Sequence, residues 1–329
     1  MRGFFRRLRD RLRPPGPRPV ILMYHRVAST SIDPWGLAVR PDHFRQHVDV
    51  LKRSRTPLAM PEFVRRLQDK TLPDNAAAVT FDDGYLDNLR EARSHLVTAG
   101  VPATVFLAAG AIGQAREFWW DEIARGILAR REALDCDVAL DGSTCRLTFE
   151  AASDDELREN SWWRAWQEPR TNRQRAYLEF WRQLRDAGSE ERDAALDRFR
   201  RLCNLSQPAA SDLPMTAGDI AQLTRGGLIE IGGHTVTHPR LPLLEPHERR
   251  REIAEGKERC ESLAGRPVSG FAYPHGAEDE ACRAAVRESG FSWACATANG
   301  FVLQTCDPFA LPRLFVQDWD AAAFEAALA

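Results

Sequence analysis

The chain has 329 residues, of which 43% are hydrophobic and 28% are charged, as is typical of one large globular domain or of a domain that carries an insertion. Its 45 Lys and Arg nearly balance its 47 Asp and Glu, so the protein lacks the positive field that would attract nucleic acid, and we expect no such partner. No segment approaches the roughly 18 uninterrupted apolar residues of a membrane span, which excludes an integral membrane protein.

A basic tail, residues 1–19, begins the chain. Its first 18 residues contain seven Arg against one acid, Asp10. Two interpretations are open: a short amphipathic helix that contacts a membrane peripherally, or a solvated tail that ends in a Pro-rich break. The Cys residues form no C-x-x-C pair and no signal peptide is recognisable, which predicts a cytoplasmic protein, at the inner membrane surface if the first interpretation holds. The apolar residues at helical spacing are Phe4, Phe5, Leu8 and Leu12.

After the tail, patterns of buried strands alternate with patterns of helices. The apolar run Val20–Tyr24 predicts a strand, and helical spacing follows over 41–53 and 60–67. This alternation is typical of a parallel sheet or barrel covered by helices, and a barrel fits the strand count better than an open sheet. Further strands are expected at 76–81, 103–107, 228–231, 270–273, 292–297 and 311–316, and further helices at 87–99, 216–225, 246–264 and 279–289.

The alternation breaks between 111 and 214, so we expect the barrel to consist of residues 20–110 and 215–329. The segment 111–214 is rich in charged and helix-forming residues, and its apolar residues recur at helical spacing. We therefore predict a largely helical insertion. Its Trp residues have two interpretations, the core of a small subdomain or a platform that stacks on a sugar ring. They are Trp119, Trp120, Trp162, Trp163, Trp166 and Trp181.

Candidate metal ligands directly follow two of the predicted strands. Asp82 and Asp83 come after the strand 76–81, and His234 and His238 come soon after a later strand. Because the carboxyl ends of parallel strands gather at one face, residues about 150 positions apart can meet there. Two His at i and i+4 share a side of a helical turn and can bind one cation. With Asp83 they would make a three-ligand site that leaves positions open for water and substrate.

Asp82 has a different expected role from its neighbour Asp83. Successive side chains after a strand point in different directions, so the two carboxylates are not expected to bind the same ion. Asp82 is then free to act as the base for the attacking water. Each pattern alone has a structural alternative: Asp-Asp-Gly is also a common turn, and either His could cap or pack. Their joint occurrence at strand ends favours the catalytic interpretation.

Several segments resemble the motifs of the polysaccharide deacetylase superfamily, which is also called NodB-homology or carbohydrate esterase family 4. The resemblance covers about 20–110 and 216–316 and leaves the tail and the insertion unexplained. The first two motifs, which carry the metal ligands, are highly specific. The matching segments are Thr80-Phe-Asp-Asp-Gly84, His234-Thr-Val-Thr-His238, Phe271-Ala-Tyr-Pro-His-Gly276 and, as flanking segments of one branch, Leu22-Met-Tyr-His-Arg-Val27 and Leu311-Pro-Arg313.

The resemblance implies a fold, a reaction and a set of roles. The fold would be a distorted (β/α) barrel of the NodB-homology type. Asp82 would be the base, and Asp83, His234 and His238 would hold one divalent ion, with Zn favoured and Co, Ni or Fe as alternatives. The reaction would be hydrolysis of an N-acyl group, typically acetyl, from an amino sugar. We expect an intracellular role in glycan or glycolipid biosynthesis, on a substrate that could be lipid-linked or nucleotide-linked.

Two departures from the family pattern affect the catalytic residues. Many members begin the third motif with an Arg that orients the base, whereas this chain has Phe271. Arg313 could replace it by pairing with Asp82, or it could be a surface residue. The C-terminal Leu-x-His that supplies the general acid is also absent. His25 is the candidate acid and His275 the alternative, although either ring could simply line the rim of the barrel.

The expected substrate pocket includes residues of the first and third motifs. Tyr273, Pro274 and His275 are expected to form a wall, and a main-chain N–H of Tyr85 or Tyr273 is available to the oxyanion. The long insertion could roof the site and select a small or lipid-linked substrate. Two other functions compete with deacetylation: a deformylase or other amide hydrolase on the same barrel, and a non-catalytic interaction protein.

Overall fold

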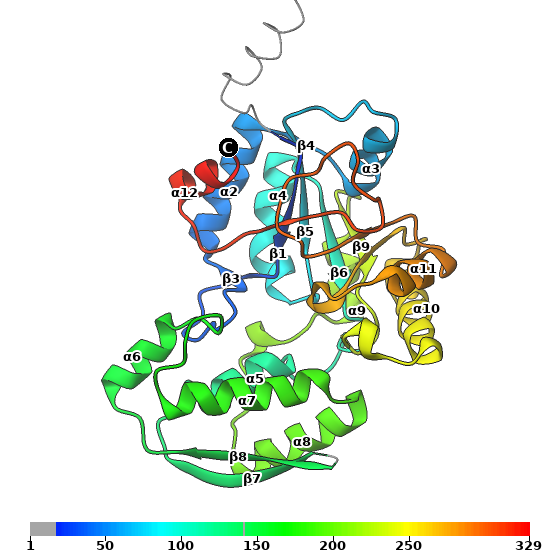
Figure 1. The fold of residues 1–329 in the computed structure, drawn as a ribbon. Coiled ribbons are helices and arrows are strands. Elements are labelled where there is room, and N and C mark those ends of the chain that lie inside the picture. The colour runs from blue at the N-terminus through cyan, green and yellow to red at the C-terminus, as the bar shows by residue number, and fades with distance from the viewer. Residues whose placement is uncertain (1–17, 141) are drawn as a thin grey trace, which may run out of the picture.

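The core of the molecule is a parallel sheet that curls into a half-barrel. The structure is a computed structural model, which describes residues 18–140 and 142–329. Most strands are buried apolar runs, as is typical of a parallel sheet with both faces covered. Figure 1 shows the sheet in the upper part of the molecule with helices around it. The strands are, in spatial order, β11 (Trp293–Cys295), β10 (Gly270–Ala272), β9 (Ile229–Gly233), β6 (Ala103–Leu107), β5 (Ala76–Phe81), β1 (Val20–Tyr24) and β12 (Leu314–Phe315), with β4 (Thr56–Pro57) beside β5.

One short segment near the C-terminus joins the two edges of this sheet. Leu311 forms a parallel bridge with Cys295 of β11, and its N–H donates to the Ala294 carbonyl at 3.0 Å. Three residues later, β12 pairs in parallel with β1, with Leu314 opposite Leu22. The predicted (β/α) barrel fold is confirmed. The structure shows in addition that 311–315 spans its open side.

Helices cover the outside of the sheet, and their ends follow ordinary capping rules. Thr216 and Asp219 form a capping box at the start of α9, and α10 ends at Gly265 in the left-handed conformation. The predicted helix 87–99 begins with a wider turn, η1 (Asn88–Ala92). The helices around the sheet are α2 (Pro41–Ser54), α3 (Met60–Gln68), α4 (Arg93–Ala99), α9 (Ala217–Leu223), α10 (Pro246–Ala264), α11 (Glu280–Glu288) and α12 (Ala321–Ala327).

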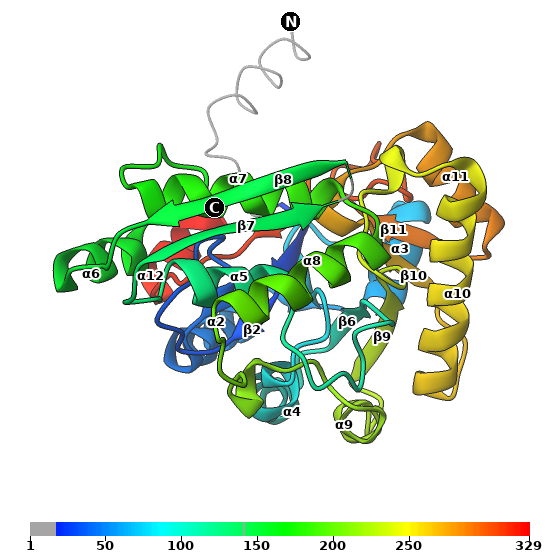
Figure 2. The same cartoon turned by 90° about the horizontal axis from the view of Figure 1, so that it is seen from below.

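The segment 111–214 forms a layer of its own at one end of the barrel. Figure 2 views this layer from below and shows a two-stranded ribbon over α7 and α8. The prediction of a largely helical insertion missed this antiparallel hairpin, although the alternating residues around Gly142 carry its signal. Its buried side chains form a cluster that also includes Tyr85 and Ala108 of the barrel. The elements are α5 (Trp119–Ile127), β7 (Leu134–Leu140), β8 (Ser143–Phe149), α6 (Asp154–Trp162), α7 (Asn172–Asp186) and α8 (Ser189–Leu202).

The basic tail lies almost entirely outside the described residues, so neither interpretation of it, an amphipathic helix or a solvated tail, is tested. Within the part of the chain that the structure describes, no helix is both long and apolar enough to cross a bilayer.

The buried imidazole of His47 connects α2 to the C-terminal segment. Its Nε2 lies 2.7 Å from the carbonyl oxygen of Trp319, which can only accept, so Nε2 carries the proton and Nδ1 accepts from the Tyr24 hydroxyl at 3.2 Å. The ring stacks on Phe324 of α12 with 4.0 Å between centroids. Burial lowers the pKa of His47 from 6.5 to about 4, because the site disfavours the charged ring.

We therefore expect the free energy of unfolding to fall as the pH is lowered from 6.5 to about 4. In that window the unfolded chain binds a proton at His47 that the folded chain does not, and the loss amounts to roughly 3 kcal/mol at most. Urea unfolding at several pH values should show that the free energy of unfolding depends less steeply on pH in His47→Gln than in the wild type. The exposed His247→Gln serves as the control, and an equal slope in all three proteins would contradict the prediction.

Candidate active site

Three candidate metal ligands meet at the carboxyl ends of β5 and β9. The Asp83 Oδ1 atom lies 3.6 Å from Nε2 of His234 and 3.6 Å from Nε2 of His238. The three ligand atoms lie within 4.8 Å of one another, and all three residues are buried. Ligand atoms about 2.1 Å from a tetrahedral ion are about 3.4 Å apart, so these separations fit one shared cation.

The two His converge through a loop, which corrects the prediction of a helical turn. The segment after His234 has no helical structure, and Thr235 and His238 have φ of 65° and 56°. A left-handed conformation at a β-branched residue is strained and persists only where its surroundings hold it. Glu252 of α10 does so, because its carboxylate accepts from the N–H groups of Val236 and Thr237, each at 2.9 Å.

Burial favours the neutral form of both imidazoles, and a hydrogen bond orients the ring of His234. Nδ1 of His234 donates to the Ala272 carbonyl at 2.7 Å, which leaves the Nε2 lone pair facing Asp83. Burial lowers the pKa of His234 and lowers that of His238 well below the ordinary value. In the absence of a cation, burial and then the Asp82 charge raise the pKa of Asp83 well above its usual range.

This donor set fits a divalent metal. Oδ1 of Asp83, which faces both His, has no hydrogen-bond partner among the described residues although it is buried. A buried carboxylate oxygen without a partner is costly, and a cation bound between it and the two imidazoles would remove that cost. The set contains one carboxylate and two imidazoles, which suits Zn and neighbouring transition metals.

Asp82 turns away from this cluster and pairs with Arg313. Nη1 and Nη2 of Arg313 donate to the two carboxylate oxygens at 2.7 and 2.8 Å, and Nε donates to the Ala296 carbonyl at 2.9 Å. Arg313 is completely buried, which excludes the alternative of a surface residue. Burial alone would raise the pKa of Asp82, but the charge of Arg313, with His234, lowers it to about 2. Asp82 is therefore ionised at neutral pH.

We expect Arg313→Met to destabilise the protein by roughly 3–5 kcal/mol, since it leaves the Asp82 charge buried without its partner. The double variant Arg313→Met with Asp82→Asn should recover part of this loss because it removes both charges. Chemical denaturation of the wild type, both single variants and the double variant gives the coupling energy. Additive effects of the two substitutions would show that the pair has no buried charge coupling.

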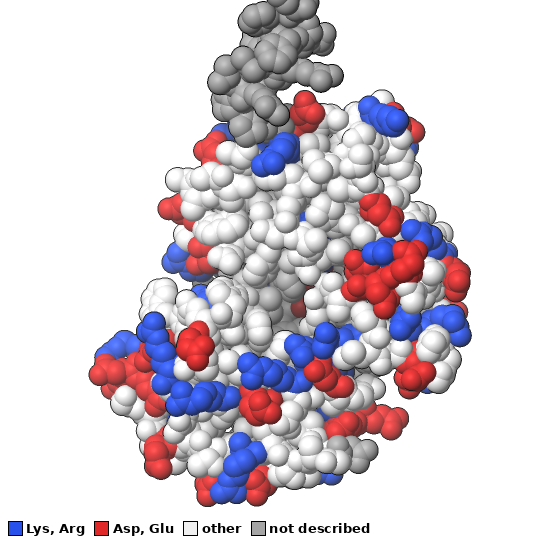
Figure 3. All heavy atoms as spheres, viewed as in Figure 1, with Lys and Arg blue, Asp and Glu red and all other residues white. Residues whose placement is uncertain are grey.

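These groups open into one cavity of about 670 Å³. It is the hollow at the centre of Figure 3, with basic side chains along its lower edge. The cavity lining includes Tyr273 and His275 but neither Tyr85 nor Pro274, which the sequence had placed in the pocket. Tyr85 is fully buried and its hydroxyl donates to Asp121 at 2.7 Å, while Pro274 is buried at the start of the short turn η4 (Pro274–Gly276).

The two candidate acids both line this cavity. His25 follows β1, and its Nδ1 is buried without a partner among the described residues. Burial lowers the pKa of His25 to about 4, although the nearby Asp82 charge acts to raise it. His275 has a φ of 56° and its ring is 4.5 Å from that of His238. Burial and a set of positive neighbours lower the pKa of His275 to about 3.

Several contacts of the site were not identified from the sequence, which offered Trp120 only as one of six Trp residues of a possible platform. Trp120 of the insertion packs its ring 4.9 Å from that of His238 and donates from Nε1 to the Tyr85 hydroxyl at 2.7 Å. Arg192 of α8 donates to the carbonyl of Thr237 at 2.8 Å and so supports the loop between the two His. No local pattern marks these contacts, since they form only when the insertion folds onto the barrel. Other lining residues of this kind are Trp35, Trp319, Arg185 and Arg240.

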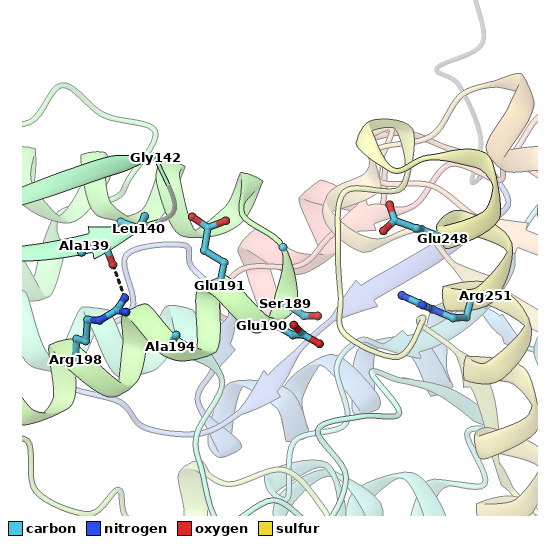
Figure 4. A pocket seen from close by; sticks show the side chains of 11 residues that line it. Ala139, Leu140, Gly142, Ser189, Glu190, Glu191, Ala194, Arg198, Glu248 and Arg251 are labelled. Atoms are coloured by element: carbon cyan, nitrogen blue, oxygen red, sulfur yellow. Dashed lines mark hydrogen bonds between the residues drawn. The ribbon is translucent and has the colours of Figure 1, made fainter.

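A second hollow of about 740 Å³ lies between α8, the hairpin and α10. Figure 4 shows Glu190 and Glu191 on α8 and Glu248 and Arg251 on α10, with Arg198 donating to the Ala139 carbonyl. It is lined by ordinary surface charges of both signs, and none of the predicted site residues borders it. Its greater volume therefore does not make it the better candidate, because the reactive groups lie in the other cavity.

Comparison with known proteins shows to which family the chain is similar. The family model described as polysaccharide deacetylase matches residues 209–294. The Bacillus subtilis (strain 168) protein named "Putative polysaccharide deacetylase YxkH" is 33% identical over 95 residues, which cover 28% of this chain and 33% of that protein. The match thus spans about a third of the curated relative. The predicted resemblance to the polysaccharide deacetylase superfamily is confirmed.

Solved structures show the same fold over nearly the whole chain. The Streptococcus pyogenes deacetylase PplD in complex with acetate superposes with a TM-score of 0.60 and 16% identity, covering 96% of this chain and 100% of that one. IcaB from Ammonifex degensii has a TM-score of 0.60 and 18% identity, covering 95% of this chain and 98% of that one. At such identities the likeness establishes the fold.

Proposed function

We propose that the protein is a metal-dependent hydrolase that removes an N-acyl group, most often acetyl, from an amino sugar. The observation that carries this proposal is an open cluster of Asp83, His234 and His238 beside an ionised Asp82, at the bottom of a cavity. When bound, a divalent ion, for which Zn is favoured, would polarise the acyl carbonyl and acidify the attacking water. The family match and the names of the similar structures support this choice of reaction.

Asp82 is proposed to take the proton of the attacking water. Its low pKa ensures that the carboxylate is free to accept a proton at neutral pH, and Arg313 fixes its orientation through two hydrogen bonds. A single strong partner on one side leaves each carboxylate oxygen a further lone pair for the water. Arg313 is thus proposed as a positioning residue for the base rather than a reacting group.

His25 is the better candidate for the acid that protonates the leaving nitrogen. The Asp82 charge acts to raise the pKa of His25, while Arg313 and His234 act to lower it. The charges that act on His275 all lower its pKa, and they come from His234 and three arginines. A His beside a carboxylate acquires a proton more readily than one among cations. The Asn88 side chain also donates to the His25 carbonyl at 2.8 Å and fixes its main chain.

The main-chain N–H of Tyr85 is proposed as the donor to the oxyanion, because it has no acceptor among the described residues, although the Tyr85 side chain does not line the cavity. The other candidate from the sequence, the N–H of Tyr273, already donates to the Cys295 carbonyl at 3.2 Å. The Tyr85 side chain is immobilised by Asp121 and Trp120, which holds its main chain beside Asp83. A donor held in place before the reaction stabilises developing charge most effectively.

We expect Asp82→Asn to lower kcat about 10²- to 10⁴-fold while bound metal stays near the wild-type amount. His234→Ala should lose both activity and metal, because it removes a ligand. Bound metal is measured for the wild type and both variants. Released acetate and formate are assayed on N-acetyl and N-formyl amino sugars. Full activity of Asp82→Asn would contradict its role, and formate as the sole product would favour the deformylase alternative.

His25→Gln should reduce kcat about 10²-fold or more, and His275→Gln should have a much smaller effect on kcat. The reason is that only His25 is proposed to give a proton to the leaving group. A substrate with a more acidic leaving amine, such as an acetanilide, should restore part of the loss in His25→Gln. Equal losses in both variants would leave the acid assignment without support.

The substrate is proposed to belong to intracellular glycan or glycolipid biosynthesis, on a lipid-linked or nucleotide-linked sugar, with membrane contact through the basic tail. The supporting observation is the insertion, which contributes Trp120, Trp181 and Arg185 to the cavity wall. The non-catalytic alternative gives no reason for three candidate ligands to converge beside an ionised carboxylate.

A further inference from the structure

Two arginines from different parts of the fold meet at the rim of the catalytic cavity. Arg185 lies in the last turn of α7 in the insertion, and Arg240 follows the His loop of the barrel. Both line the cavity that contains Asp82 and Asp83. Their side chains are 25% and 32% exposed, so a ligand in the cavity can reach them.

The two guanidinium groups share a single carboxylate. Asp186 accepts from Nε and Nη2 of Arg185, each at 2.8 Å, and from Nη1 of Arg240 at 3.0 Å. One of the two positive charges is therefore uncompensated locally. Within the described chain, Nη1 of Arg185 and both Nε and Nη2 of Arg240 have no hydrogen-bond partner, so donors remain for an anion.

The inner part of the cavity does not supply the missing negative charge. Its lining contains two acids, of which Asp82 is already neutralised by the buried Arg313. The charge of Asp83 would be neutralised by the divalent ion of the proposed function. A loaded cavity thus has a net positive charge, which favours an anionic ligand.

Aromatic rings fill the distance between the metal-ligand cluster and the arginines. The ring of His275 is 4.5 Å from that of His238 and 6.3 Å from that of Trp181, and the Arg185 guanidinium lies 4.9 Å above Trp181. Trp181 packs in turn on Trp35, with 4.3 Å between centroids. A wall built of aromatic rings suits the apolar face of a sugar ring held between the two polar ends.

We propose that the cavity selects an amino sugar that carries an anionic group, a phosphoryl or a carboxylate, and that Arg185 and Arg240 bind that group. The inference rests on the proposed function, because it takes the acyl amide to lie at Asp83 and the anion to lie at the rim. Arginine suits both anions, since its planar donors match their oxygens in pairs. The insertion is then a specificity element that completes the subsite with α7.

The test measures binding separately from turnover. Metal-loaded protein carrying Asp82→Asn is titrated by calorimetry with N-acetylglucosamine 1-phosphate, with N-acetylmuramic acid and with the neutral methyl glycoside of N-acetylglucosamine. We expect at least one anionic ligand to bind about tenfold more tightly than the neutral one, and the preferred ligand distinguishes phosphoryl from carboxylate recognition. Adding Arg240→Gln or Arg185→Gln should abolish the preference, and Arg240→Lys should retain part of it.

Arg182→Gln is the matched control. Arg182 lies on the same helix, is 58% exposed, pairs with Glu179 and does not line the cavity, so its loss should leave the preference unchanged. Equal binding of all three ligands, or a preference that survives both Gln substitutions, would overturn the proposal. Asp186 and the two arginines would then only form ion pairs that connect the insertion to the barrel. Acetate release by the wild type is measured in parallel, and protein that binds the anionic ligand without releasing acetate would refute the proposed function alone.

Discussion

The buried ion pair between Asp82 and Arg313 is the interaction on which the rest of the site depends. Two opposite charges held in the interior are stable only with close geometry and satisfied hydrogen bonds, and Arg313 meets both conditions through Asp82, Thr80 and the Ala296 carbonyl. Arg313 lies in the segment 311–315 that joins the edges of the sheet. The same contact therefore helps to close the half-barrel and keeps the proposed base ionised.

The candidate metal ligands are held in place by contacts from several parts of the fold. Asp83 has a φ of 74°, so its carboxylate is presented by a strained turn rather than by the strand itself. The His loop is fixed by Glu252, which requires α10 to approach closely. Gly256 permits that approach, because a Cβ there would lie 2.9 Å from the main-chain carbon of Thr235. The strained main chain beside the candidate ligands is thus stabilised by the packing of α10 against it.

The insertion is part of the site rather than an appendage to the barrel. Trp120 contacts the ring of His238, Arg192 binds the carbonyl of Thr237, and Tyr85 of the barrel is buried in the core of the insertion. A change in the packing of the insertion would therefore disturb a metal-ligand loop. This coupling gives a physical reason why the segment could tune both substrate choice and the geometry of the proposed reaction.

The sequence by itself determined the order of the main strands and helices of the barrel, because buried parallel strands are continuous apolar runs such as Ala76–Phe81 and most are followed by a helical pattern. It also determined which carboxylates and imidazoles gather, because they stand directly after strands whose ends meet. The tertiary structure alone decided the loop conformation between His234 and His238, the support from Glu252, and the rim formed by Arg185 and Arg240. Those features are contacts between distant segments, and a local pattern of residues carries no information about which distant side chain will fill a given space.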